Sequence, residues 1–193
     1  MQIKSHEIGF DLDGVIAATG ETFLRLACQD FGHCSFSLED IKDFEVEDCL
    51  GIPKDHVEQL FYIIMKNSLQ TGLQPMEGAV EVISQLATQA PVTIITARPL
   101  TQPVTDWLDH FFPDETCQNI KLVATGDHND KTRYIKEHNL QYFVDDRVET
   151  CLQLAAETNI TPIVFNQPWN RNRHTLANVS DWQEMKSYLK DLQ

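Results

Sequence analysis

Two pairs of acidic residues are the first candidates for chemistry in this chain. Asp11 and Asp13 belong to the run Asp11-Leu12-Asp13-Gly14, which directly follows a short apolar segment. Side chains alternate along an extended segment, so both carboxylates point to the same side, and Gly14 permits a tight turn after them. Two such carboxylates repel each other unless a cation is bound, and hard oxygen ligands suit Mg²⁺. A solvated acidic turn is the alternative, but the position directly after an apolar run favours a functional site.

The second acidic pair, Asp145 and Asp146, follows the apolar run 142–144. Aspartates in this position often cap the N-terminus of a helix, where the helix dipole favours negative charge. Capping does not exclude metal binding, so the pair remains a candidate for a second set of metal ligands.

Thr96 and Lys131 are two further candidates, each with an ordinary structural explanation. Thr96 ends the apolar run 92–95 and is either a helix-start residue or a hydroxyl that binds a phosphoryl oxygen. Lys131 follows the polar run 126–130, near the expected start of a helix. Helix N-termini disfavour cations, but a bound phosphate would attract both the lysine and the backbone N–H groups. A solvated surface lysine is the alternative.

The elements that must position these residues follow from the apolar pattern. Short apolar runs alternate with helical patterns, which is typical of an α/β domain with a Rossmann-like, mostly parallel sheet flanked by helices. The expected strands are 7–10, 92–95, 120–124, 142–144 and 162–165. Ligands of open parallel sheets bind beyond the carboxyl ends of the strands. Three of these runs end at Asp11, Thr96 and Asp145, so these residues could converge at one rim.

Helical periodicity predicts the rest of the organisation. Expected helices cover 23–31, 57–65, 80–86, 104–111 and 148–155, with a short helix starting near Asn129 and a last one from about Asp181. No strand is predicted between about residues 17 and 75. We therefore expect a core of residues 1–16 and 76–193, interrupted by an all-helical cap of residues 17–75, with Gly72 and Pro75 where the chain returns.

Composition limits the possible partners and the compartment. The chain has 193 residues, 42% of them hydrophobic, and a formal net charge of −14. This charge argues against binding a nucleic-acid polymer, although it allows a small anionic substrate. The sequence contains no apolar run long enough to span a membrane and no signal-peptide pattern at its start. The cysteines are odd in number and form no CxxC pair, so we expect free thiols and a cytoplasmic location; they are Cys28, Cys34, Cys49, Cys117 and Cys151.

Taken together and in this order, the motifs resemble those of the haloacid dehalogenase superfamily. They are FDLDGV (10–15), TIITAR (93–98), Lys131 and YFVDDR (142–147). The resemblance spans about residues 7–165, and the helical insertion is similar to the superfamily's cap of the first type. An aspartate two residues after the nucleophile marks the phosphatases of this superfamily.

The resemblance implies a Mg²⁺-dependent phosphatase. Asp11 would attack phosphorus and form an aspartyl-phosphate, while Asp13 would serve as acid and then as base. Thr96, Ala97 and Lys131 would hold the phosphoryl oxygens. Mg²⁺ would be bound by Asp11, by the backbone carbonyl of Asp13 and by the second acidic pair, with Asp146 as the direct ligand and Asp145 orienting a metal-bound water.

A narrower resemblance concerns the substrate. The segment 165–171 and the later Trp182 are similar to the 5'(3')-deoxyribonucleotidase family, which implies a small phosphorylated partner such as a nucleoside monophosphate. Arg98, Asn170 and Arg171 are then candidate substrate contacts, although Asn170 and Arg171 could equally tie down the C-terminal loop. The residues after the first motif and the segment 96–99 depart from that family's pattern.

Three alternatives stay open at this point. One is a phosphatase of a sugar phosphate or another small metabolite, and another is a phosphomutase, which would use the same motifs. The third is a non-catalytic binding domain on the same fold, which predicts a broken motif set, whereas the set here is intact. The cap aromatics could form a wall for a nucleobase, but their helical spacing favours a place in the core. The sequence does not indicate an oligomeric state.

Overall fold

Six parallel strands form the centre of the molecule. The computed structural model describes residues 2–127 and 130–192. The strands run in the order β3-β2-β1-β4-β5-β6, and every neighbouring pair is parallel. Their bounds are β1 (Ile8–Phe10), β2 (Val92–Thr96), β3 (Ile120–Ala124), β4 (Tyr142–Asp145), β5 (Thr161–Phe165) and β6 (Asn178–Val179). The expected α/β class is confirmed, and β6 is the strand that the sequence did not predict.

The strand order reverses at β1, and this places the chemistry. Phe10 is in register with Ile94 of β2 on one side and with Val144 of β4 on the other. The residues that follow these strands therefore meet at one edge of the sheet. In doubly wound sheets the crevice at such a reversal is where ligands bind.

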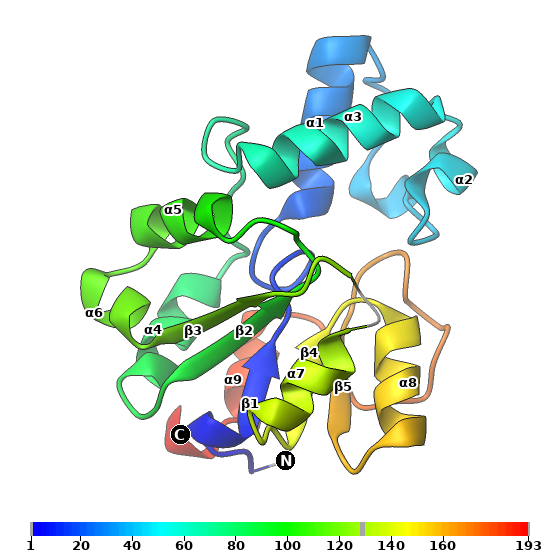
Figure 1. Ribbon diagram of the computed structural model, residues 1–193. Helices are drawn as coiled ribbons and strands as arrows, with labels where there is room; N and C mark the ends of the chain where they lie inside the picture. The colour runs from blue at the N-terminus through cyan, green and yellow to red at the C-terminus, as the bar shows by residue number, and fades with distance from the viewer. Residues whose placement is uncertain (1, 128–129, 193) are drawn as a thin grey trace.

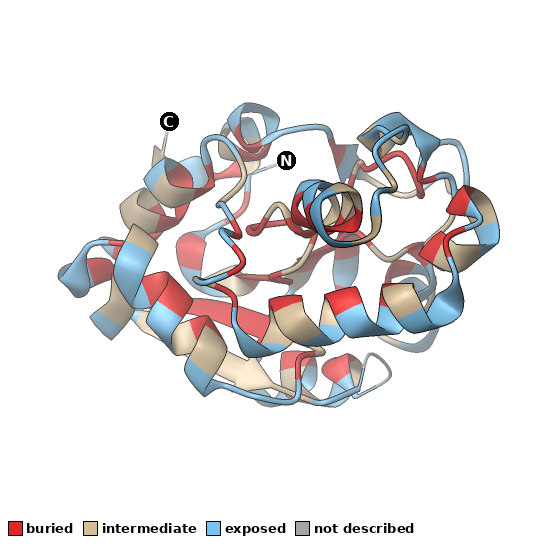
Figure 2. Cartoon of the chain, turned by 90° about the horizontal axis from the view of Figure 1, so that it is seen from above, coloured by how far each residue is buried: buried red, intermediate tan, exposed pale blue. Residues whose placement is uncertain are grey.

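Helices cover both faces of the sheet. Figure 1 shows α4 and α9 on one face and α7 and α8 on the other, with α5 and α6 beside β2 and β3. In the view from above, buried residues gather toward the centre and exposed residues lie on the outer sides of the helices (Figure 2). The core helices are α4 (Ala79–Ala87), α5 (Gln102–Phe111), α6 (Asp114–Gln118), α7 (Lys131–Glu137), α8 (Val148–Glu157) and α9 (Trp182–Tyr188), with short 3₁₀ turns η1 (Ser5–Glu7) and η3 (Lys190–Leu192).

The sequence predicts where two of the core helices, α7 and α9, begin. The last helix begins as expected, because the Asp181 side chain accepts a 2.7 Å hydrogen bond from the backbone N–H of Glu184 and so caps α9. The expected start near Asn129 lies outside the described residues, and α7 begins at Lys131 in the described part. Helix α6 was not predicted.

Residues 17–75 form a helical layer above the carboxyl end of the sheet (Figure 1). This segment, which the structure describes throughout, holds α1 (Thr19–Phe31), η2 (Leu38–Asp40), α2 (Val46–Leu50) and α3 (Lys54–Lys66) and no strand. Helices α1 and α3 pack through Phe23 and Phe61, whose stacked rings lie 4.9 Å apart. Phe23 is fully buried. These two aromatics therefore serve the cap's own packing rather than a wall for a nucleobase.

The chain enters and leaves the cap side by side. Ala17 and Pro75 form an isolated antiparallel bridge. The backbone N–H of Ala18 donates to the Gln74 carbonyl (2.9 Å), and that of Met76 donates to the Ile16 carbonyl (2.7 Å). The two segments that join the cap to the core are thus hydrogen-bonded to each other. The division into a core of residues 1–16 and 76–193 and a cap of residues 17–75 stays a prediction.

One expectation from the sequence is wrong: the five cysteines are not all free. Cys28 and Cys34 form a disulfide, while Cys49, Cys117 and Cys151 carry free thiols. The cause is the end of α1, where Gly32 adopts a left-handed conformation (φ 75°) and turns the chain back. This turn brings the two Cα atoms to 4.3 Å. A spacing of six residues without a CxxC pattern carried no signal for this pairing.

Across residues 2–127 and 130–192, no helix is both long and apolar enough to cross a membrane.

Candidate active site

Asp11 lies directly beyond β1 at the point where the strand order reverses. Its backbone N–H donates to the Val144 carbonyl of β4 (2.8 Å), so the neighbouring strand fixes its position. Its side chain is 6% exposed. One carboxylate oxygen, Oδ1, accepts a hydrogen bond from the Leu12 N–H (2.8 Å). The other oxygen, Oδ2, lies 2.7 Å from Lys131 Nζ.

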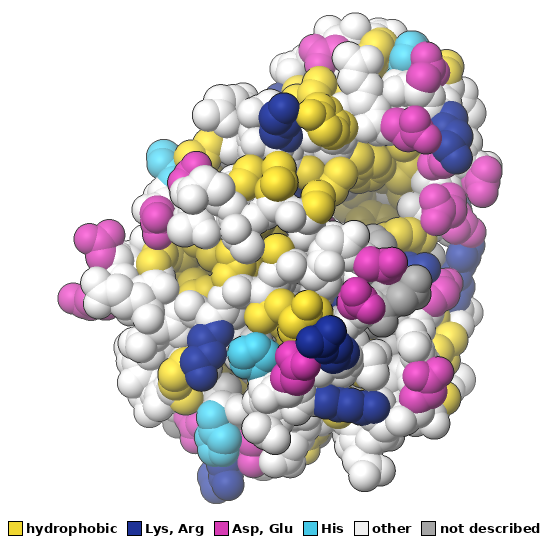
Figure 3. All heavy atoms as spheres, viewed as in Figure 1, with side chains coloured by type: hydrophobic (Ala, Val, Ile, Leu, Met, Phe, Trp, Pro, Cys, Tyr) yellow, Lys and Arg dark blue, Asp and Glu magenta, His cyan; other side chains and the backbone are white. Residues whose placement is uncertain are grey.

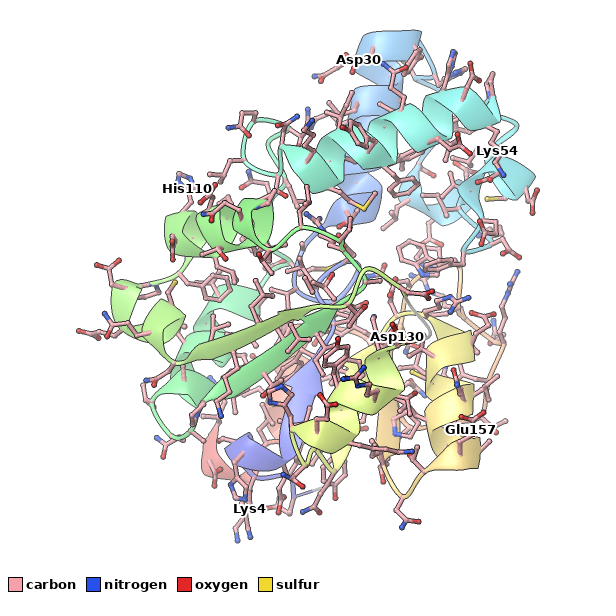
Figure 4. All side chains as sticks on the ribbon, viewed as in Figure 1. Lys4, Asp30, Lys54, His110, Asp130 and Glu157 are labelled. Atoms are coloured by element: carbon pink, nitrogen blue, oxygen red, sulfur yellow. A yellow bond between two sulfur atoms is a disulfide. The ribbon has the colours of Figure 1, made fainter. Side chains whose placement is uncertain are left out.

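Lys131 reaches this carboxylate from the start of α7 on the neighbouring face. Figure 4 places the preceding residue, Asp130, at the rim of the core that faces the cap. The Lys131 side chain is completely buried, and Nζ also lies 2.8 Å from Asp145 Oδ2. Burial alone would lower the pKa of Lys131, but the two carboxylates outweigh it and raise the pKa above its ordinary value. The site therefore holds a permanent cation against Asp11.

A tight loop after Asp11 returns the chain toward the site. Gly14 has a left-handed backbone (φ 68°), which glycine adopts at little cost. The Gln167 side-chain amide donates to the Gly14 carbonyl (2.7 Å), and Trp182 Nε1 donates to the Val15 carbonyl (2.9 Å). Two segments from the C-terminal part of the chain thus hold the loop that carries Asp13.

Asp13 is held by three donors. Arg98 Nε donates to Oδ2 (2.8 Å) and Arg98 Nη2 to Oδ1 (2.7 Å), and the Thr19 hydroxyl donates to Oδ1 (2.5 Å). Burial favours a raised pKa, but the charge and hydrogen bonds of Arg98, aided by Thr19, outweigh it and lower the pKa of Asp13. The side chain is 32% exposed, so it is open to a reactant from one side.

The two residues of the second acidic pair, Asp145 and Asp146, have different hydrogen-bond partners. Asp145 is fully buried, and its Oδ2 accepts from Lys131 while its Oδ1 accepts from the Arg147 N–H (2.8 Å). Asp146 accepts a hydrogen bond on Oδ2 from Trp169 Nε1 (3.0 Å). The Asp146 Oδ1 atom is therefore the better placed of these oxygens to bind a cation.

The donor set fits a divalent metal ion. Asp11, Asp145 and Asp146 are buried and offer one oxygen each, all within 4.8 Å of one another. Burial and the neighbouring carboxylates raise the pKa of Asp11 to about 7, against the opposing effect of Lys131, and raise the pKa of Asp146 well above its ordinary value. Three buried carboxylates thus face one lysine, an excess of negative charge that a cation would relieve. Oxygen-only ligands suit Mg²⁺.

Thr96 and Ala97 occupy the end of β2, beside β1. The Thr96 side chain is fully buried, and its hydroxyl oxygen accepts from the backbone N–H of Arg98 (3.2 Å). That leaves the Thr96 O–H as a donor for another oxygen. Ala97 is partly buried at the adjacent position. The structure therefore places both residues at the rim that carries Asp11, and their binding of phosphate stays a prediction.

Comparison with known protein families identifies the chain. Residues 5–192 match the family described as "5' nucleotidase, deoxy (Pyrimidine), cytosolic type C protein". The chain belongs to this nucleotidase family. The match covers nearly the whole chain, cap included.

Two curated relatives carry related names. The chain is 28% identical to "Putative nucleotidase YqfW" from Bacillus subtilis (strain 168), over 95% of this chain and 93% of that protein. It is 25% identical to "Putative nucleotidase BH1399" from Halalkalibacterium halodurans, over 97% of this chain and 94% of that protein.

Solved structures show the same fold at lower identity. A haloacid dehalogenase-like family hydrolase from Streptococcus pneumoniae aligns with a TM-score of 0.62 at 17% identity, over 94% of this chain and 96% of that one. A structure described as a putative phosphoglycolate phosphatase from Lactobacillus plantarum aligns with a TM-score of 0.57 at 12% identity, over 96% and 100% of the two chains. The protein is thus a nucleotidase-family phosphatase with a haloacid dehalogenase-like fold.

The three candidate substrate contacts all have protein partners in this nucleotidase-family member. Arg98 is 2% exposed and paired with Asp13. Asn170 is 1% exposed, and its amide donates to the carbonyls of Asp146 (2.7 Å) and Phe165 (2.8 Å). Arg171 Nη1 contacts both carboxylate oxygens of Glu39 in the cap (2.9 and 2.8 Å). These contacts attach Asn170 to the core and Arg171 to the cap, and a contact of either residue with a substrate stays a prediction.

Four residues at the site were not singled out from the sequence. Thr19 contacts Asp13, Trp169 contacts Asp146, Gln167 supports the Gly14 turn, and Ser68 contacts Arg98. Gln167 and Trp169 lie in the segment that carried the family resemblance, so a sequence signal existed for them. Ser68 and Thr19 sit in polar cap segments without a motif, and their roles depend on tertiary packing.

Proposed function

We propose that the protein hydrolyses nucleoside monophosphates in a Mg²⁺-dependent reaction that passes through an aspartyl-phosphate on Asp11. The observation that supports this most is the arrangement at the end of β1. There a buried carboxylate lies 2.7 Å from a buried lysine and within reach of two further carboxylates, with Asp13 two residues away. This combination supplies a nucleophile, a phosphate-binding cation and a metal site in one place.

In the first step, an Asp11 carboxylate oxygen attacks phosphorus as the bond to the ester oxygen breaks. Asp13 in its protonated form, which its lowered pKa makes the minor form, donates a proton to that departing oxygen, which leaves as the nucleoside hydroxyl. Lys131, the Thr96 hydroxyl and the backbone N–H of Ala97 bind the remaining phosphoryl oxygens, whose charge must be neutralised during transfer. When bound, Mg²⁺ shields the negative phosphate from the negative nucleophile.

In the second step, Asp13, now unprotonated, takes a proton from a water molecule. The water attacks the phosphorus of the aspartyl-phosphate, and Asp11 is released together with inorganic phosphate. Arg98 and Thr19 favour the charged form of Asp13, which suits its role as a base at this stage. Asp146 would bind the metal directly, with Asp145 held by Lys131 and the Arg147 N–H.

The family match and the names of the relatives support a nucleoside monophosphate as the substrate. The surface is hollowed along the boundary between cap and core, where apolar side chains gather (Figure 3). Phe44 of the cap is partly buried at this boundary, and its ring lies under the guanidinium of Arg147, 5.3 Å from the centroid. A nucleobase is a flat, partly apolar group that such a boundary would accept.

The proposed activity also suggests where the protein is located and what it binds. We propose a cytoplasmic enzyme, as the three free cysteines suggest, in which the Cys28–Cys34 bond would be open to reduction. Its partner is a small phosphorylated molecule rather than a nucleic-acid polymer, because the chain carries a formal net charge of −14.

The test is phosphate release with Mg²⁺ from ribo- and deoxyribonucleoside 5'- and 3'-monophosphates and from sugar phosphates, beside Asp11→Asn. We expect the nucleoside monophosphates to have the highest kcat/KM and Asp11→Asn, which keeps the side-chain size, to be inactive. Turnover of sugar phosphates alone would reject the substrate assignment but keep the mechanism. An active Asp11→Asn enzyme would reject the covalent mechanism.

A further inference from the structure

Arg98 is a buried cation that the proposed phosphate chemistry does not use. Its side chain is 2% exposed and follows β2 by two residues. The guanidinium makes three side-chain hydrogen bonds. Two go to the two oxygens of Asp13, at 2.8 and 2.7 Å, and the third joins Nη1 to the Ser68 hydroxyl oxygen at 2.7 Å. These three hydrogen bonds join the guanidinium to the core and to the cap.

Ser68 belongs to the cap, directly after α3. It is 1% exposed, and its O–H donates to the Ile64 carbonyl of α3 (3.1 Å). The Ser68 oxygen is therefore held by the cap helix while it accepts from Arg98. One planar guanidinium thus links Asp13, in the core, with the segment by which the chain leaves the cap.

We propose that Arg98 is a positioning residue for Asp13: it fixes the carboxylate that transfers the proton, and its contact with Ser68 makes that position depend on the cap. This inference rests on the proposed function, because it assigns a role within the same reaction. It replaces the role of substrate contact that the sequence suggested for Arg98.

Arg98 can fix the orientation of the Asp13 carboxylate because two of its N–H groups bind that carboxylate together. A bidentate pair of N–H groups fixes both the plane and the rotation of a carboxylate, which a single donor does not. Within the described residues, Asp13 Oδ1 accepts from Arg98 Nη2 and the Thr19 hydroxyl, whereas Oδ2 accepts from Arg98 Nε. Oδ2 therefore keeps more free lone-pair capacity and is the oxygen better placed to meet the ester oxygen.

The contact between Arg98 and Ser68 makes the orientation of Asp13 depend on the position of the cap. If the cap moved relative to the core, Ser68 would withdraw an acceptor from a buried guanidinium. Arg98 would then relax toward other partners and release Asp13 from its fixed orientation. Proton transfer needs close control of distance and direction, so a correctly placed cap favours the chemical step as well as covering the substrate.

The test uses two leaving groups. A nucleoside alkoxide needs a proton to leave, whereas p-nitrophenolate leaves readily without one. The enzyme with Mg²⁺ is assayed on a nucleoside monophosphate and on p-nitrophenyl phosphate, as wild type, Arg98→Lys, Arg98→Met, Ser68→Ala and Asp13→Asn. Arg133→Lys, a change in an exposed arginine of α7, is the matched control. Circular dichroism and the melting temperature monitor folding.

We expect Arg98→Lys and Arg98→Met to lower kcat/KM for the nucleoside monophosphate about 100-fold, since a general acid contributes roughly 10²- to 10⁴-fold. The fall on p-nitrophenyl phosphate should be less than about 5-fold, as in Asp13→Asn. Lys has a charge but no fork, so it should rescue little. Ser68→Ala should lower kcat/KM for the nucleoside substrate alone, by about 3- to 10-fold, and Arg133→Lys should change kcat/KM for neither substrate.

Equal losses of kcat/KM on both substrates would overturn the inference, because Arg98 would then support phosphate binding or the fold. A raised KM with unchanged kcat would overturn it in favour of a substrate contact. Should the Arg98 variants fail to fold, Ser68→Ala decides. An equal loss of kcat/KM on both substrates, or no loss on either, would reject the link to the cap. An active Asp11→Asn enzyme would reject the proposed function itself, and this inference with it.

Discussion

Gly14 connects the loop that follows Asp11 to Asp146, a proposed metal ligand, and replacing it by alanine should damage both. A Cβ at this position would lie 2.3 Å from Asp146 Oδ2 and 2.7 Å from its Cγ. Real Cβ atoms essentially never come this close, so the carboxylate must move. That oxygen is also the acceptor for Trp169 Nε1 at 3.0 Å, so the movement would break a buried hydrogen bond.

Gly51 offers a control for the loss of stability in Gly14→Ala, because its backbone conformation is nearly the same. Gly51 also has positive φ (64°, against 68° for Gly14), and an added Cβ there meets nothing within 4 Å. Gly51→Ala therefore experiences the left-handed strain alone, about 1–2 kcal/mol, offset by roughly 0.4–1 kcal/mol from a stiffer unfolded chain. Gly14→Ala adds the loss of a bond to a charged acceptor, about 1.5–3 kcal/mol.

We therefore expect Gly14→Ala to lower the free energy of unfolding by about 3 kcal/mol and Gly51→Ala by about 1 kcal/mol. The assay is urea unfolding of both variants, followed by the Mg²⁺ concentration that gives half-maximal activity. Displacing a proposed metal ligand should raise that concentration by about 10- to 100-fold in Gly14→Ala and leave it unchanged in Gly51→Ala. Equal destabilisation of both variants with unchanged Mg²⁺ dependence would refute the reasoning.

Three further predictions concern the charges of the site. Lys131→Met should cost about 3–5 kcal/mol of unfolding free energy, because it leaves two buried carboxylates without their cation; an unfolding midpoint no lower than that of the exposed-lysine control Lys136→Met would contradict this. Trp169→Phe removes a donor to Asp146 and should raise the Mg²⁺ needed for half-saturation about 10-fold, measured by calorimetric titration; unaltered Mg²⁺ affinity would speak against it. Because the pKa of Asp11 rises from 3.8 to about 7 on folding, the folded protein holds a proton between these pH values that the unfolded chain releases. The melting temperature in chelator should then fall from pH 4 to pH 7 relative to Asp11→Asn, and Mg²⁺ should remove the difference. Parallel pH profiles for the two proteins would rule out this linkage.

The sequence predicts the parts of the site that depend on local pattern. Apolar runs of three or four residues end at Asp11, Thr96 and Asp145, and parallel strands bring such ends together whatever the loops do. The strand order itself, with β1 between β2 and β4, was not available from these runs.

The contacts that tune the site depend on residues far apart along the chain. Arg98 meets Asp13 over a separation of 85 residues, and Trp169 meets Asp146 over 23. A polar residue gives no local sign of such a partner, so the sequence alone suggests a substrate contact for Arg98 and not its pairing with Asp13. Strand β6 has two residues and pairs with β5, which is too short for a period of two to register.

The hydrogen bond from Trp169 to Asp146 also has an optical consequence. The chain has three tryptophans, and the other two donate to backbone carbonyls: Trp107 to Leu73 and Trp182 to Val15. Only Trp169 among them donates to a carboxylate, so its indole senses any change in charge there. Its emission should shift when a cation binds, while the other two give a constant background. The protein thus carries a native fluorophore from which the occupancy of its acidic cluster can be followed in real time without a label.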